Sequence, residues 1–278
     1  MPTKLLNCTI NYLKFNKRMN DISVTIIQTN LFWEDVDKNL SHFDAKLKDI
    51  KESTDIIVLP EMFTTGFTMN PKALAEDRGG KGLQWMLQKA KDKNCVIVGS
   101  VSVKDKQNFY NRLYWAMPDG SYQFYDKRHL FQMGKEHLHY TAGTSKMIID
   151  YKGWKICPLI CYDLRFPVWS RNVKDSPYDL LIYVANWPAI RSYPWQQLLI
   201  ARAIENQTYV IGVNRVGEDG NGIAHSGDSC ILNPRGEVIS KLKADENISE
   251  TVVLSQGYLE DFRQAFPVLS DGDEFRID

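Results

Sequence analysis

Twelve short runs rich in Ile, Val and Tyr recur along the chain, each bounded by turn-forming residues. Runs of this length and composition are typical of β-strands. Three other segments, at 33–51, 83–90 and 195–203, place apolar side chains three or four residues apart, which predicts helices with one buried face. Twelve strands are too many for one open sheet between helices, so we expect an α/β fold with two sheets packed face to face and helices outside. The runs are 22–29, 55–59, 96–103, 112–117, 122–125, 147–150, 154–160, 180–184, 209–213, 229–232, 238–242 and 251–254.

The chain contains no linker, repeat or low-complexity stretch, so we expect residues 19–278 to form a single domain. Residues 1–18 carry four basic side chains and no acid, and Met19 then begins a segment that runs directly into the first strand. We interpret 1–18 as an N-terminal extension, either translated from an upstream start codon or forming an ordered arm. A targeting peptide is the alternative, but the segment lacks a long apolar centre.

Charge and cysteine content restrict the possible partners. Lys plus Arg and Asp plus Glu both number 34, so there is no basic excess to attract nucleic acid or an anionic membrane. No apolar run is long enough to span a bilayer. The five cysteines form no C-x-x-C pair, which predicts reduced thiols in the cytoplasm and no structural zinc. We therefore expect a cytoplasmic protein that acts on a small molecule and needs no metal or cofactor.

Three predicted strands each lead into a chemically reactive side chain. These are Glu61, Lys127 and Cys161. Because ligands bind at the carboxyl ends of strands in α/β sheets, we expect a carboxylate, an ammonium and a thiol to meet at one edge.

Together these three groups suit acyl transfer. A nearby ammonium favours the thiolate that attacks a carbonyl carbon, and a carboxylate can take up the thiol proton. The ammonium can then stabilise the oxyanion, while the protonated carboxyl group gives its proton to the leaving amine and later activates water. Each residue alone has an ordinary explanation, namely a buried inert cysteine, a helix-capping acid and a surface lysine.

The residues around each position strengthen the case, because three motifs occur in order. Leu59 to Phe63 reads LPEMF, Tyr125 to Phe131 reads YDKRHLF, and Ile160 to Pro167 reads ICYDLRFP. From about residue 21 to 254 the chain resembles the nitrilase, or carbon–nitrogen hydrolase, superfamily. The resemblance implies a four-layer α-β-β-α sandwich, dimers that pair through outer helices, and a Glu61–Lys127–Cys161 triad. It also implies a supporting carboxylate at Glu136 and an oxyanion hole formed by Lys127 with the backbone N–H of Tyr162.

Further segments resemble the bacterial omega-amidase branch: RFPVWSRN from 165, ANWP from 185, AIENQ from 203 and VNRVG from 213. This implies hydrolysis of the terminal amide of 2-oxoglutaramate or 2-oxosuccinamate, through a thioester, to the 2-oxo dicarboxylate and ammonia. Amidase or carbamoyl hydrolase activity on another small carboxylated amide is the alternative. Val168 replaces a glutamate common in other branches, which we interpret as the loss of a charge from the pocket.

Such a substrate carries a carboxylate far from its amide, and arginine binds carboxylates with paired hydrogen bonds. Arg165 and Arg191 are the candidates, with Asn186 and Trp187 as further substrate-binding residues. Arg165 could instead form a structural salt bridge. If neither arginine binds the carboxylate, the backbone amides of 217–222 are the next candidates.

Four other interpretations are weaker. A Cys–His enzyme would need one of His129, His137 or His139 beside Cys161. A metal at His137 and His139 lacks a third ligand in the sequence nearby. A nitrilase-fold binding protein would be expected to lose the nucleophile, and a redox pair of Cys157 with Cys161 lacks a resolving motif.

Overall fold

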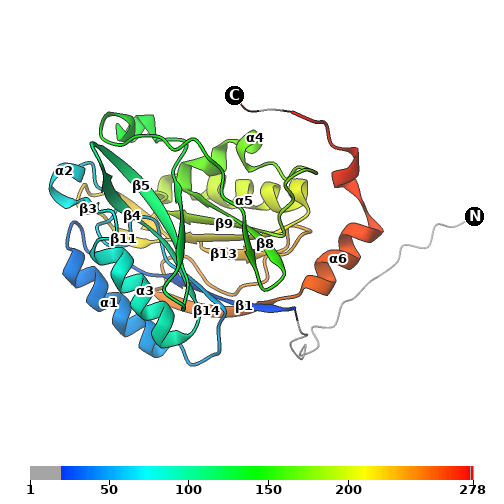
Figure 1. The fold of residues 1–278 in the computed structure, drawn as a ribbon, viewed down its shortest axis with the longest axis horizontal. Helices are drawn as coiled ribbons and strands as arrows, with labels where there is room; N and C mark the ends of the chain where they lie inside the picture. The colour runs from blue at the N-terminus through cyan, green and yellow to red at the C-terminus, as the bar shows by residue number, and fades with distance from the viewer. Residues whose placement is uncertain (1–19, 276, 278) are drawn as a thin grey trace, which may run out of the picture.

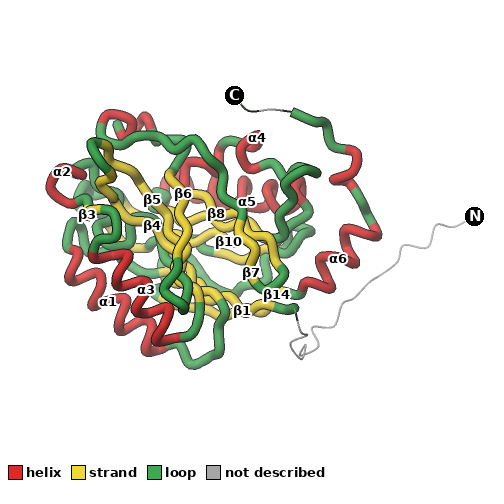
Figure 2. Tube along the Cα trace, in the orientation of Figure 1, coloured by secondary structure: helices red, strands yellow, loops and turns green. Residues whose placement is uncertain are grey.

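The computed structural model describes residues 20–275 and 277, so the predicted extension at 1–18 lies outside the described residues. Two β-sheets pack face to face, and helices cover their outer faces (Figure 1; Figure 2). This is the four-layer α-β-β-α sandwich that the resemblance implied. Among the described residues, no helix is both long enough and apolar enough to cross a membrane.

The first sheet has seven strands and mixes parallel and antiparallel pairs. Its strand order is β14-β1-β2-β4-β5-β6, with the short β3 paired to β4. Neighbouring β1, β2 and β4 run parallel, whereas β14, β5 and β6 pair antiparallel with their neighbours. The strands are β1 Ile22–Gln28, β2 Ile56–Val58, β3 Glu76–Asp77, β4 Val96–Asp105, β5 Asn108–Ala116, β6 Tyr122–Asp126 and β14 Ile248–Leu254.

The second sheet has five strands in the order β13-β10-β9-β8-β7, with a parallel centre formed by β8, β9 and β10. A separate antiparallel hairpin pairs β11 with β12. The strands are β7 Ile149–Tyr151, β8 Trp154–Ile160, β9 Leu180–Ala185, β10 Tyr209–Asn214, β11 Val216–Glu218, β12 Ala224–Ser226 and β13 Cys230–Leu232.

Alternation along the strands divides the apolar interior into two clusters. In β2, Ile56 and Val58 belong to the cluster that fills the space between the sheets and continues under α5, whereas Ile57 belongs to the cluster under α1 and α3, as the period of two requires. Helices α1 and α3 pack on the first sheet in Figure 1, and α5 contacts β10 and β13 of the second. The helices are α1 Val36–Asp49, α2 Pro71–Leu74, α3 Lys81–Lys93, α4 Pro167–Ser170, α5 Ser192–Asn206 and α6 Gln256–Ala265.

One predicted strand, 238–242, is wrong. Its only bridge joins Val238 to Leu232 of β13. The hydroxyl of Ser240 accepts the N–H of Ile231, at 3.0 Å, in the place where a second strand would offer a backbone carbonyl. This side-chain bond ends the ladder after one rung. Strands β3, β11 and β12 were not predicted, because elements of two or three residues leave no periodic pattern. The ten-residue helix α6 was also not predicted; Leu259 is its one buried side chain, so its apolar stripe is weak.

Candidate active site

The three motif residues converge as the sequence predicted, but they do not share the edge of a single sheet. Glu61 follows β2 and Lys127 follows β6, both in the first sheet, whereas Cys161 follows β8 in the second. They meet where the ends of the two sheets face each other. All three side chains are buried.

Glu61 is held by three donors from three different segments. Its Oε1 accepts hydrogen bonds from Lys127 Nζ at 2.9 Å and from Asn111 Nδ2 at 2.7 Å. Its Oε2 accepts the backbone N–H of Asn186 at 2.8 Å. The carboxylate is fully buried, so these bonds replace its hydration and fix its orientation.

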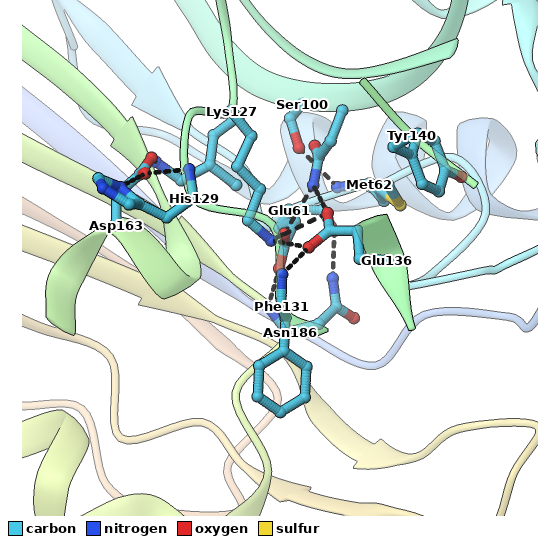
Figure 3. A network of polar contacts seen from close by, with 12 residues as sticks. Glu61, Met62, Ser100, Lys127, His129, Phe131, Glu136, Tyr140, Asp163 and Asn186 are labelled. Carbon is cyan, nitrogen blue, oxygen red and sulfur yellow. Dashed lines mark hydrogen bonds and ion pairs between the residues drawn. The ribbon is translucent and has the colours of Figure 1, made fainter. Parts of the chain in front are cut away.

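Lys127 lies between two carboxylates (Figure 3). Its Nζ donates to Glu136 Oε2 at 2.9 Å and Oε1 at 3.1 Å, in addition to Glu61. Phe131 N–H donates to Glu136 Oε2 at 2.6 Å. Burial alone would lower the pKa of Lys127, but the negative charges of Glu136 and Glu61 outweigh it and raise that pKa above its ordinary value. The ammonium is therefore permanently charged, and Glu136 supplies the balancing charge that the sequence predicted.

Cys161 begins the 3₁₀ turn Cys161–Arg165 with its backbone in the left-handed region, at φ 43°. Such a φ is uncommon outside glycine and is typical of strained turns at functional sites. Burial raises the pKa of the Cys161 thiol well above its ordinary value. The negative charge of Glu61 raises it further, and Lys127 lowers it by less. Lys127 favours the thiolate, as the sequence predicted, but burial and the two carboxylates oppose it by more.

A second polar network ties the turn after Cys161 to the loop after Lys127. The carboxylate of Asp163 is fully buried and accepts bonds from Tyr125 Oη at 2.7 Å and from the backbone N–H of Ile160 at 3.1 Å. It also accepts both the backbone N–H and the ring Nδ1–H of His129, at 3.0 and 2.8 Å. His129 is thus committed to Asp163.

The positions of the other two histidines argue against the Cys–His and metal interpretations. His137 and His139 are exposed. Within residues 20–275 and 277, no group of three His, Cys, Asp or Glu side chains gathers in a way that could hold a metal ion.

Cys161 opens into a cavity of about 460 Å³. Arg165 and Arg191 both line it, and each guanidinium lies over an aromatic ring, 5.0 Å from the centroid of Trp187 and 5.4 Å from that of Phe131. Neither arginine forms an ion pair with any acid in the described part of the chain. The salt-bridge interpretation of Arg165 is therefore wrong. Asn186, Trp187 and Tyr162 also line the cavity.

The β11–β12 hairpin forms a further wall, contributing Asp219, Asn221, Ile223 and His225. Asp219 Oδ1 accepts the backbone N–H groups of Asn221 and Ile223, at 2.8 and 3.0 Å, and its carbonyl accepts that of Gly222 at 3.0 Å. The amides of Asn221 and Gly222 are consequently occupied within the loop. They are not free to hold a substrate carboxylate.

Val168 does not remove a charge from this cavity. Its side chain is exposed on α4 and lines a different depression, beside Arg171 and Phe275. The turn Cys161–Arg165 separates α4 from the thiol, and Val168, the second residue of α4, is exposed.

Sequence reasoning missed Asn111 and Asn214. Asn111 Nδ2 bridges the carboxylates of Glu61 and Glu136, at 2.7 and 3.3 Å. Asn214 binds both the N–H and the C=O of Trp187, at 2.8 and 3.0 Å. For Asn111 the available signal was an amide in the middle of a strand, because a buried amide in a sheet must have specific partners.

A thiol that lines a cavity and interacts with a buried carboxylate and a buried ammonium defines a class of cysteine-centred hydrolases, and comparison with known proteins agrees. The profile of the carbon-nitrogen hydrolase family matches residues 23–263, so this chain belongs to that family. It is 50% identical over 261 residues to omega-amidase YafV of Escherichia coli (strain K12), covering 93% of this chain and 100% of the relative. It is 32% identical to 2-oxoglutaramate amidase of Bacillus subtilis (strain 168), covering 90% and 96%.

A solved structure shares the fold at similar coverage. XC1258 from Xanthomonas campestris, described as a CN-hydrolase superfamily protein with an arsenic adduct in the active site, superposes with a TM-score of 0.91. The two chains are 40% identical, and the match covers 94% of this chain and 100% of that one.

Proposed function

We propose that this protein is an omega-amidase, which hydrolyses the terminal amide of a 2-oxo omega-amide such as 2-oxoglutaramate or 2-oxosuccinamate. The products are the 2-oxo dicarboxylate and ammonia. The relatives named above support this activity. The observation that carries it is the placement of two arginines, neither paired with an acid among the described residues, in the same cavity as Cys161. A cavity of about 460 Å³ accommodates a five-carbon dicarboxylate monoamide.

The first half of the reaction forms a thioester. Because the Cys161 thiol is protonated at rest, Glu61 takes its proton as Sγ attacks the amide carbon. The C–N bond then breaks as Glu61 returns that proton to the leaving nitrogen, which departs as ammonia. Glu61 ends this half-reaction as a carboxylate again.

The second half hydrolyses the thioester. Glu61 accepts a proton from water as the water oxygen attacks the thioester carbon. When the new tetrahedral intermediate collapses, the C–S bond breaks and Glu61 returns the proton to Sγ. The acid product leaves and the thiol is restored.

Lys127 and Tyr162 form the proposed oxyanion hole. One bifurcated N–H can serve both oxygens of Glu136 and a second serves Glu61, which leaves the third N–H of Lys127 for the oxyanion. The N–H of Tyr162 lies in the first turn of a helix, where N–H groups have no acceptor within the helix. Asn111 and Glu136 hold Lys127 and Glu61 in position.

The substrate preference tests the proposal. Ammonia release from 2-oxoglutaramate, L-glutamine and an uncharged aliphatic amide should be compared as kcat/KM on one preparation. A charge-assisted bond to the far carboxylate is worth about 1.5–3 kcal/mol, so we expect a roughly tenfold to hundredfold preference for 2-oxoglutaramate over the uncharged amide. If the uncharged amide is the best substrate, the omega-amidase assignment fails, while cysteine amidohydrolase chemistry survives.

We also propose a cytoplasmic homodimer. The four cysteines within the described residues are all free thiols, which suits a reducing compartment. Val168 on α4 and Ile204 on α5 expose apolar side chains on the helical outer layer, where a second copy could cover them. Light scattering at several protein concentrations tests the dimer, and a monomer throughout would contradict it.

A further inference from the structure

His225 is a buried imidazole in the wall of the cavity that the mechanism does not use. It lies on β12, only 4% of its surface is exposed, and it lines the same cavity as Cys161 and the two arginines. Its Nδ1 has no hydrogen-bond partner among the described residues. A buried polar atom without a partner costs free energy unless a ligand supplies one, so this position calls for an explanation.

The imidazole is neutral at working pH. Burial lowers its pKa to about 4, the positive charge of Arg215 lowers it further, and Asp219 opposes them by less. A neutral imidazole carries one N–H donor and one lone pair. It can therefore donate a hydrogen bond without adding a charge to the cavity.

Arg215 places a fixed positive charge behind this wall. Its guanidinium is fully buried and donates to the backbone carbonyls of Val216 at 3.1 Å and Glu218 at 2.9 Å, both in the hairpin, and of Leu31 at 3.3 Å. These partners are dipoles, and the carboxylate of Asp219 offsets part of the charge, but Arg215 has the larger effect on His225. A positive potential at His225 favours a carbonyl oxygen and disfavours an ammonium group.

The proposed substrate presents such an oxygen. Between the amide at Cys161 and the carboxylate at the arginines lies C2, which carries a carbonyl in a 2-oxo acid and an ammonium in glutamine. Asn186 Oδ1 also lacks a partner within the described part of the chain, but it can only accept and so suits the N–H of the substrate amide. The carbonyl needs a donor, which the imidazole of His225 provides.

We propose that His225, supported by Arg215, selects 2-oxo over 2-amino and 2-deoxy omega-amides by donating a hydrogen bond to the C2 carbonyl oxygen. This inference rests on the omega-amidase function proposed above and deepens it by assigning the group that recognises the 2-oxo substituent. His225 acts on substrate selection and takes no part in proton transfer at Cys161.

The test compares 2-oxoglutaramate with glutaramate, which has CH₂ in place of the C2 carbonyl, and with L-glutamine. Wild type should rank them in that order by kcat/KM. In His225→Leu, we expect the ratio of 2-oxoglutaramate to glutaramate to fall by about tenfold, the value of one neutral hydrogen bond. His225→Gln, which keeps a neutral donor, should retain most of the ratio. Glu218→Gln is the control, because that side chain is exposed on the same hairpin and does not line the cavity.

A ratio of two substrates on one preparation does not depend on the fraction of enzyme that is folded. An unchanged ratio in His225→Leu, or an equal loss on both substrates, would overturn the inference, the latter by showing a structural or general catalytic role. A wild-type enzyme that does not distinguish 2-oxoglutaramate from glutaramate would overturn it as well. Failure of the omega-amidase proposal can be told apart from failure of this inference, because it appears when wild type is compared on 2-oxoglutaramate and the uncharged amide.

Discussion

The carboxylate of Asp163, in the turn that begins at Cys161, accepts two hydrogen bonds from His129, in the loop that follows Lys127. The first sheet leads to Lys127 and the second to Cys161, so this pair fixes the segment that follows Lys127 against the turn that begins at Cys161. It links the two sheets at the level of the proposed chemistry and makes the distance between ammonium and thiol depend on a buried ion.

Asp163→Asn should destabilise the protein and impair catalysis. Tyr125, Ile160 and His129 all donate to this carboxylate, but the amide of asparagine has only one acceptor oxygen, so its NH₂ group would face another donor. We therefore expect a loss of about 3 kcal/mol in the free energy of unfolding. In the folded variant kcat should fall more than KM changes, because the cavity is intact while the thiol is displaced. Urea titration and steady-state kinetics measure both effects. Asp150→Asn, which alters only an exposed pair, should match wild type; equal kcat in Asp163→Asn would contradict a positioning role.

Cys161→Ala should abolish ammonia release, by at least about a thousandfold, without unfolding the protein. The thiol makes the proposed covalent bond, and the small cavity left by its removal lies at the floor of an existing pocket. Activity and thermal melting of the same sample check this. Cys230→Ala is the matched control and should retain activity, because Cys230 lies outside the cavity. Near-normal turnover by folded Cys161→Ala would rule out Cys161 as the nucleophile.

Alkylation of Cys161 should report its raised pKa. Only the thiolate reacts, so the rate with iodoacetamide should still be rising above pH 9, with no plateau near neutrality. Glu136 is among the groups that raise this pKa. Removing its charge in Glu136→Gln should therefore lower the pKa and move the profile to lower pH. Mass spectrometry of the Cys161 peptide separates this reaction from that of other thiols. A plateau below pH 7 in wild type would show that a thiolate is present at rest.

Arg165→Met and Arg191→Met should raise KM for 2-oxoglutaramate, together by tenfold to a hundredfold, with little effect on the uncharged amide. Both guanidinium groups lie over aromatic rings and have no acidic partner among the described residues, so they can receive a carboxylate. Methionine keeps the length and the apolar packing while removing the charge. If both variants and the double variant leave the substrate ranking intact, another group holds the carboxylate.

His225 should make the protein less stable in acid. Its pKa in the folded state is about 4, below the 6.5 of an unperturbed imidazole, so the unfolded chain binds the proton first as pH falls. Stability is therefore lost between pH 6.5 and 4, by about 2–3 kcal/mol from this one group. Unfolding free energies at pH 7 and 4.5 should differ less in His225→Gln than in wild type. His139→Gln, at an exposed site, should lose as much stability in acid as wild type. If His225→Gln also loses as much unfolding free energy between pH 7 and 4.5 as wild type, the prediction is contradicted.

The sequence by itself determined the layer architecture and the three reactive groups. Alternating apolar runs require strands, their number requires two sheets, and a strand followed by a reactive side chain is a local pattern that can be read from neighbouring residues. The motifs around Glu61, Lys127 and Cys161 are likewise contiguous. For the same reason Glu136 could be predicted, because it lies only nine residues from its partner Lys127.

Only the tertiary structure decided the groups that hold and surround them. Glu61 and Asn186 are 125 residues apart, Asp163 and His129 are 34 apart, and the hairpin with His225 reaches the cavity from a third part of the chain. Such contacts depend on how the two sheets pack, which no local pattern encodes. The protonation of Cys161 depends on them as well, because the sum of burial and nearby charges sets a pKa, and that sum exists only once the sheets have met.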